Sequence, residues 1–130
     1  MDLNVLLPIL FERSNATETF WNFYIVVALG ILGFFSSAKP TANLRTVQIL
    51  FTAGFLGFAF TNLDALLWVF AQRKALANEI MTLIPSGPLA PLKDNILPPG
   101  KTLVVVFHVA CDITVLAMIW FLPRRLPPSR

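Results

Sequence analysis

The sequence has 130 residues, enough for one domain, and carries a formal net charge of +3. Hydrophobic residues make up 56% of it and charged residues only 13%, about half the charged fraction of an average soluble domain. This composition argues against a soluble protein and predicts an all-α integral membrane protein. It does not indicate nucleic-acid binding, because the basic residues lie singly or in pairs, mostly at the ends of apolar runs.

The first predicted elements are a short amphipathic segment and a membrane span. Residues 2–13 are largely apolar but too few to cross a bilayer and are interrupted by Pro8. We expect them to form an N-terminal interfacial helix at the level of the lipid headgroups, with a loose tail as the alternative. Residues 20–38 form the first apolar run of sufficient length, and Pro40 disfavours helix at the residue before it.

Two further runs are long enough to span, since a bilayer core needs about 20 apolar residues. Residues 47–71 lie between Arg45 and Arg73, and residues 102–122 lie between Lys101 and Arg124. Cationic residues at both ends are typical of transmembrane helices, whose termini meet the headgroups. The sequence therefore predicts three transmembrane helices.

The remaining segments lie outside the predicted spans. Residues 75–84 are predicted to form a surface helix, which either extends the second span beyond the membrane or bends flat onto its surface. Residues 85–101 contain five prolines in the stretch 85–100 and are predicted to be a Pro-rich loop between the second and third spans. Residues 123–130 form a basic tail.

The distribution of basic residues gives an expected orientation. Loop 39–45 and the C-terminal tail together contain five Lys or Arg and no acid. The N-terminal tail and loop 73–101 also contain five, alongside five acids, so the count alone is balanced. The basic residues of the first side are concentrated in shorter segments, close to the membrane. We therefore expect the N-terminus outside and the C-terminus in the cytoplasm.

Small residues recur every four positions in the second span, at Ala53, Gly57 and Thr61, and a weaker version occurs in the first span at Gly33 and Ser37. Rows of small residues let helix backbones approach closely in lipid, where hydrophobicity does not drive association. The favoured interpretation is packing among the three helices of one chain. The alternative is a contact between subunits.

Polar residues inside the second and third spans form the candidate site: Asn62, Asp64, His108 and Asp112. At about 1.5 Å rise per residue, Asp64 lies about 7–8 Å outward of the middle of its span, and His108 about 6–7 Å outward of the middle of the other. Antiparallel packing would bring these two side chains to one level. His108 and Asp112 are four residues apart and share a helix face. We therefore expect one connected intramembrane polar cluster.

The cluster is compatible with three kinds of chemistry. Polar pairs between spans can simply hold a bundle together. Histidine beside carboxylates can also relay protons or line an aqueous path. A metal site using His108, Cys111 and Asp112 is only weakly indicated, because one His and one Cys do not form a usual ligand set. Haem on a single axial His has no further support, and we assign no catalytic residue and no cofactor.

Three functions follow, in order of preference. The first is a small integral membrane interaction or accessory subunit that packs into a homo-oligomer or a larger membrane complex. Its expected partners are the lipid bilayer and other membrane subunits or further copies of itself. The alternative is an oligomeric pore or a proton- or ion-conducting channel that uses Asp64, His108 and Asp112. The third is a metal- or haem-binding membrane enzyme subunit, which ranks last because no catalytic spacing is present.

Overall fold

The computed structural model describes residues 2–37, 43–84 and 96–125, and every regular element among them is helical. Three long helices are present, α1 (Leu3–Ser37), α2 (Leu44–Leu83) and α4 (Lys101–Phe121), and a short 3-10 helix, η1 (Leu122–Arg125), follows α4. Each long helix is apolar and long enough to cross a membrane, which confirms the three predicted spans. These properties are compatible with an integral membrane protein.

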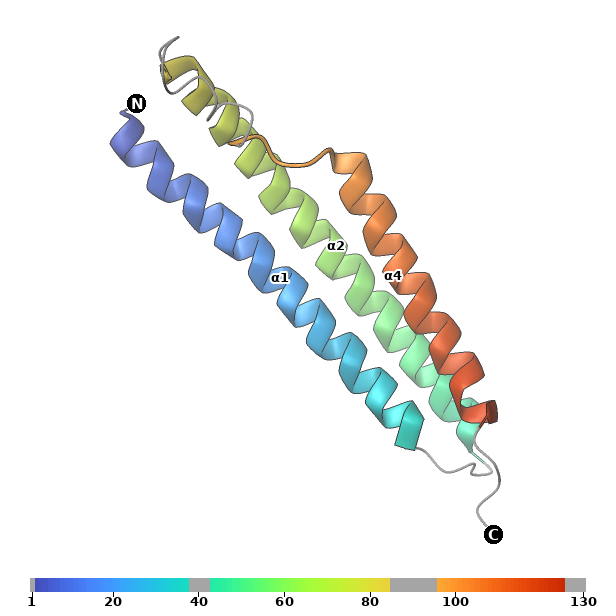
Figure 1. Ribbon diagram of the computed structural model, residues 1–130. Helices are drawn as coiled ribbons and strands as arrows, with labels where there is room; N and C mark the ends of the chain where they lie inside the picture. The colour runs from blue at the N-terminus through green and yellow to red at the C-terminus, as the bar shows by residue number, and fades with distance from the viewer. Residues whose placement is uncertain (1, 38–42, 85–95, 126–130) are drawn as a thin grey trace.

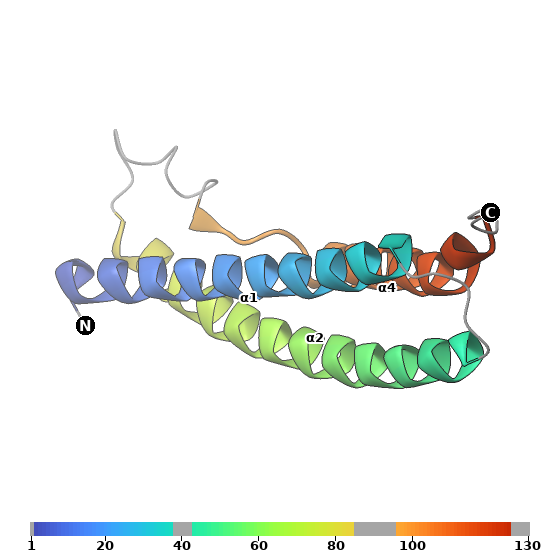
Figure 2. The same cartoon turned by 90° about the horizontal axis from the view of Figure 1, so that it is seen from below.

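The helices form an elongated bundle in which α1 and α4 run in the same direction and α2 runs antiparallel to both (Figure 1). Helix α4 has 21 residues, which corresponds to about 30 Å and matches the hydrocarbon core of a bilayer. Helices α1 and α2 have 35 and 40 residues and are therefore longer than that core. At the end of the bundle that holds the N-terminus, α1 and α2 extend beyond the start of α4, and Ile96 packs on them (Figure 2).

The core of the bundle is built from residues spaced alternately three and four apart, as in coiled coils. On α1 these are Tyr24, Ala28, Ile31 and Phe35, all buried. They pack against Phe55 and Ala59 of α2 and against Val115 and Ile119 of α4. Since lipid is as apolar as these side chains, it is close packing rather than removal from water that holds the helices together here.

The segment predicted as a separate interfacial helix is continuous with the first span. Residues 3–13 belong to α1, which passes through Pro8 without interruption. Proline removes one backbone hydrogen bond, and here packing outweighs that loss, because Leu6 and Leu10 are buried against α2. The break expected at Pro8 is therefore wrong, and an interfacial position for these residues is not confirmed.

The partner surface for this segment comes from the far end of α2. Residues 75–83 continue α2 instead of bending away, so that Ala77 and Ile80 are buried against α1, together with Ile84 just beyond the helix. We refer to this second packing region, made of Leu6, Leu10, Ala77, Ile80 and Ile84, as the helical extension. The predicted Pro-rich loop lies mostly outside the described residues, at 85–95.

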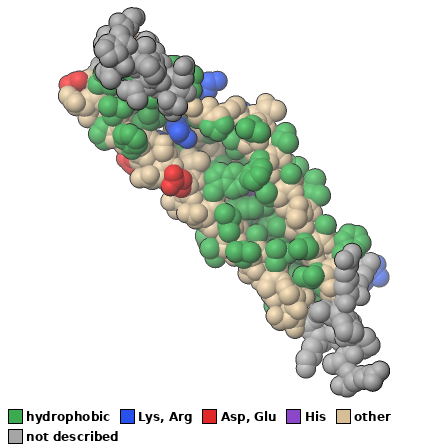
Figure 3. Space-filling view, viewed as in Figure 1, with side chains coloured by type: hydrophobic (Ala, Val, Ile, Leu, Met, Phe, Trp, Pro, Cys, Tyr) green, Lys and Arg blue, Asp and Glu red, His purple; other side chains and the backbone are tan. Residues whose placement is uncertain are grey.

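The outer surface follows the pattern expected of a membrane protein. Figure 3 shows hydrophobic side chains covering the middle of one face, with charged side chains gathered toward the two ends. Large exposed side chains include Phe60 and Trp68, which are 75% and 69% exposed. In each helix only one stripe of residues faces the bundle, while the remainder is available to lipid or to other helices.

Candidate functional site

Polar side chains from all three helices meet in the middle of the bundle. His108 and Asp112 lie one turn apart on the inward face of α4, and the Nδ1 atom of His108 is 3.0 Å from Oδ2 of Asp112. Tyr24 of α1 donates its hydroxyl proton to Oδ1 of Asp112 at 2.8 Å. Asn62 of α2 places Nδ2 3.3 Å from Nε2 of His108. We refer to these four residues as the polar network.

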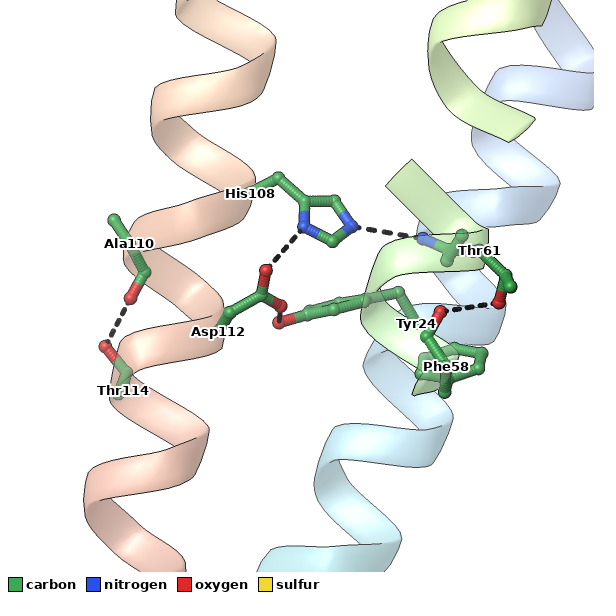
Figure 4. A network of polar contacts seen from close by, with 8 residues as sticks. Tyr24, Phe58, Thr61, His108, Ala110, Asp112 and Thr114 are labelled. Carbon is green, nitrogen blue, oxygen red and sulfur yellow. Dashed lines mark hydrogen bonds and ion pairs between the residues drawn. The ribbon is translucent and has the colours of Figure 1, made fainter. Parts of the chain in front are cut away.

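One arrangement of protons satisfies every contact in the polar network. The amide of Asn62 donates to Nε2 of His108, so the imidazole proton lies on Nδ1 and is donated to Asp112. The hydroxyl of Tyr24 donates to the other carboxylate oxygen. Asp112 thus receives one hydrogen bond from α1 and one from its own helix, and His108 links it to α2. Figure 4 shows the Tyr24 ring reaching the carboxylate and the imidazole bridging toward α2.

The polar network is closed off from its surroundings. The side chain of His108 is 0% exposed and that of Asp112 is 16% exposed, while Asn62 and Tyr24 are buried. Aromatic rings enclose the imidazole, with the ring centroids of Tyr24 and Trp21 at 4.7 and 5.5 Å from it. The groove beside it, lined by residues such as Ile25, Cys111 and Thr114, is apolar. Hydrogen bonds within a low-dielectric site are strong, and an unpaired group there is costly.

Two further polar contacts fix the register of α2 against α4. Gln48 is buried and donates from Nε2 to the backbone carbonyl of Ile119 at 2.7 Å. Trp120 donates from Nε1 to the hydroxyl of Thr52 at 3.2 Å. With the Asn62 contact, these bonds tie α2 to α4 along most of the length of α4.

Asp64 does not join the polar network. It is exposed, whereas Asn62 on the same helix is buried. The reason is geometric, because two residues along an α-helix correspond to a rotation of about 200°. Depth alone places Asp64 near His108, but rotation directs it to the other side of α2. The expectation that Asp64 and His108 would meet is therefore wrong.

The predicted packing stripe also lies outside the bundle. Ala53, Gly57 and Thr61 are exposed, and no atom beyond the local helix lies within 4 Å of a Cβ placed on Gly57. The same holds for Gly33, and Ser37 is exposed as well. Packing within one chain is therefore not what these residues do, because the helices contact each other through residues on their opposite faces. A contact between subunits stays a prediction.

The metal alternative does not match the geometry. The parts of the chain that the structure describes contain no group of three His, Cys, Asp or Glu side chains placed to share one metal ion. Cys111 is partly exposed, and it lines the apolar groove between α1 and α4 instead of pointing at His108 and Asp112 together.

Sequence reasoning missed two contributors to the polar contacts. Tyr24 is the single tyrosine of the chain and lies inside an otherwise apolar run, which was an available signal. Gln48 lies near the start of the second span, where a polar residue is unremarkable. Both residues lie on the inward faces of their helices. Those faces can be identified only when the three-and-four spacing of the core residues is matched across all three helices.

The architecture defines a class: a three-helix bundle with the properties of a membrane protein and a buried polar network at its centre. Comparison with known proteins assigns the chain to no family, because no family model, curated protein or solved structure matches it.

Proposed function

We propose that this protein is a small integral membrane accessory subunit, which packs by the outer face of α2 into a larger membrane assembly. One observation carries the proposal: the small-residue stripe Ala53, Gly57 and Thr61 faces away from the bundle. A stripe of this kind permits close approach of another helix in lipid. Since α1 and α4 cover the opposite face of α2, the helix that uses the stripe would come from another chain.

The polar network supports the same proposal. Its groups bond to one another and connect all three helices, so they are suited to fixing the bundle in one conformation. Buried polar contacts of this type often specify a unique arrangement of packed helices. A rigid bundle with an uncovered outer face is a suitable scaffold for assembly.

The pore or channel alternative receives less support. Asp64 lies on the outer side of α2, away from His108 and Asp112, so the three residues do not line one path. His108 is completely buried, and the groove beside it is apolar. A conducting path formed between several copies would therefore not include His108. Equal proton flux through vesicles containing wild-type protein or Asp112→Asn would reject this alternative.

The proposal includes an orientation and an environment for the helical extension. We place the N-terminus outside and the C-terminus in the cytoplasm, from the concentration of basic residues near the membrane in loop 39–45 and the tail. The extension then lies on the outer side, where residues 2–13 pack on α2 near the headgroups. It would offer partner proteins a second contact outside the hydrocarbon core.

Mild extraction from native membranes, followed by native mass measurement, tests the proposal. We expect the protein to migrate in an assembly larger than one chain. Gly57→Leu should reduce that assembly, because a bulky side chain blocks close approach on the stripe. Gly30→Leu is the matched control, since Gly30 is also an exposed glycine with free space, on α1. A monomer without partners in wild-type extracts would contradict the proposal.

A further inference from the structure

With the ends of α4 taken as the limits of the hydrocarbon core, Asp64 lies inside that core, at a depth that can be derived from the contacts of its helix. Asn62 is level with His108, and Asp64 is two residues, or about 3 Å, further toward the start of α4. His108 is seven residues, or about 10 Å, below Lys101, which begins α4. The carboxylate is therefore about 7–8 Å below the level of Lys101.

The described part of the chain offers no group that compensates the carboxylate of Asp64. Among the described residues it has no hydrogen bond or ion pair. Arg73, on the same helix, is nine residues away, which is about 13 Å along the axis and half a turn around it. Lys74 is ten residues away on α2, Arg13 lies on α1 and Lys101 begins α4, and none of these three forms an ion pair with Asp64. A carboxylate in hydrocarbon costs up to about 3 kcal/mol at the bilayer centre, and such residues generally have a partner.

We propose that Asp64 pairs with a Lys or Arg side chain on a transmembrane helix of a different protein, docked on the outer face of α2. This inference rests on the proposed function and names the chemistry of the partner. Charge complementarity selects the occupant, because an opposite charge removes the cost of exposing the carboxylate to lipid. A second copy does not meet this requirement. A two-fold contact through this face would bring Asp64 toward Asp64, and no Lys or Arg among the described residues lies at that depth.

The neighbours of Asp64 fit a helix at close range. Thr61 and Gly57 lie about one and two turns before it on the same face, and both are exposed. The hydroxyl of Thr61 is bonded to the carbonyl of Gly57, which leaves Asp64 as the uncompensated polar group of this face. Small residues beside it let a partner backbone approach, so a short carboxylate can reach a basic side chain. Phe60 and Trp68 are large and exposed, and would pack around the pair.

A designed transmembrane peptide provides the test. The probe is a Leu-rich helix with a single Lys at the depth of Asp64, reconstituted with the full chain in phosphatidylcholine vesicles. Association is measured by energy transfer between labels on the two amino termini. We expect binding about tenfold tighter than that of the same peptide without Lys, in the range reported for polar contacts between model helices. Moving the Lys to the opposite leaflet should abolish the gain.

Variants of the chain identify the residue responsible. Asp64→Leu should remove the gain, and Asp64→Asn should remove most of it. Glu18→Gln is the matched control. Glu18 is an exposed acid on α1, outside the proposed contact, so this substitution should leave binding unchanged. Equal binding of all peptides, or tight binding retained by Asp64→Leu, would overturn the inference. Energy transfer between two labelled copies of the chain that depends on Asp64 would also overturn it, since the occupant would then be a second copy.

The native assembly separates this inference from the proposed function. If wild-type protein extracts as a monomer without partners, the proposed function fails. If it extracts in an assembly whose mass is unchanged by Asp64→Leu, the proposed function stands and the pairing at Asp64 is wrong. Loss of a partner from Asp64→Leu extracts supports both, provided that the lost protein has a Lys or Arg within a transmembrane helix.

Discussion

Asp112 and Asp64 are both carboxylates within the part of the bundle that is apolar enough to span a membrane, yet their surroundings are opposite. Asp112 faces inward from α4, accepts a hydrogen bond from Tyr24 and contacts His108. Asp64 faces outward from α2 and contacts no polar side chain among the described residues. Depth does not explain this difference, since both lie well inside the ends of α4. Rotation about the helix axis does.

The contrast shows that one residue type serves two purposes in lipid, according to the helix face that presents it. An inward carboxylate with donors on neighbouring helices holds those helices together. An outward carboxylate does nothing for its own chain, which is why we assign it to a partner. Substitutions on the two faces should therefore affect different measurements: stability for the inner face and association for the outer face.

The largest effect on stability is expected from His108→Ala. This change removes a completely buried ring and leaves Asp112 and Asn62 without the group that connects them. Cavity formation and an unpaired buried polar group act together, so we expect a loss of about 3 kcal/mol in the free energy of unfolding. Denaturation with sodium dodecyl sulfate in mixed micelles measures it.

A control on the same helix makes the first prediction specific. Val106 is exposed on α4, and Val106→Ala should change the free energy of unfolding by less than about 0.5 kcal/mol. A similar loss for both variants would show that the polar network has no special role.

Leu10→Ala tests how much a buried apolar side chain in the helical extension contributes to stability. Leu10 is buried against α2 outside the span of α4, so the change creates an apolar cavity only. We expect a loss of about 2 kcal/mol that is confined to the extension. Hydrogen exchange should speed up in residues 3–13 and 72–84 and stay unchanged around His108. Faster exchange throughout the bundle would mean that the two packing regions unfold together.

These comparisons also explain which parts of the fold and of the candidate site could be predicted from the sequence. The prediction of three helices, each long and apolar enough to span a membrane, is confirmed, because length and hydropathy indicate such a helix directly. The connection of Asn62, His108 and Asp112 followed from depth and from spacing within one helix. The error at Asp64 arose because depth was used without helix rotation. The continuity of α1 through Pro8 depends on a packing partner more than 60 residues away in the chain, which local sequence does not reveal.

A smaller effect is expected from the contact between Tyr24 and Asp112. Tyr24→Phe removes one hydrogen bond while keeping the ring, and should cost about 1 kcal/mol. Asp112→Leu removes both acceptor oxygens, so it also breaks this bond and should cost at least as much. The double variant should lose less stability than the sum of the two single losses, because each single change already breaks the shared bond. Simple additivity in the micelle denaturation experiment would indicate that the two groups act independently.

The smallest effect on the isolated chain is expected from Asp64→Leu. The carboxylate makes no contact within the bundle, so its removal should change the free energy of unfolding by less than about 0.5 kcal/mol. The same variant should lose a partner in native extracts, which separates a role in assembly from a role in folding. A loss of more than about 1 kcal/mol in micelles would show that Asp64 supports its own bundle, and the distinction between the two carboxylates would then disappear.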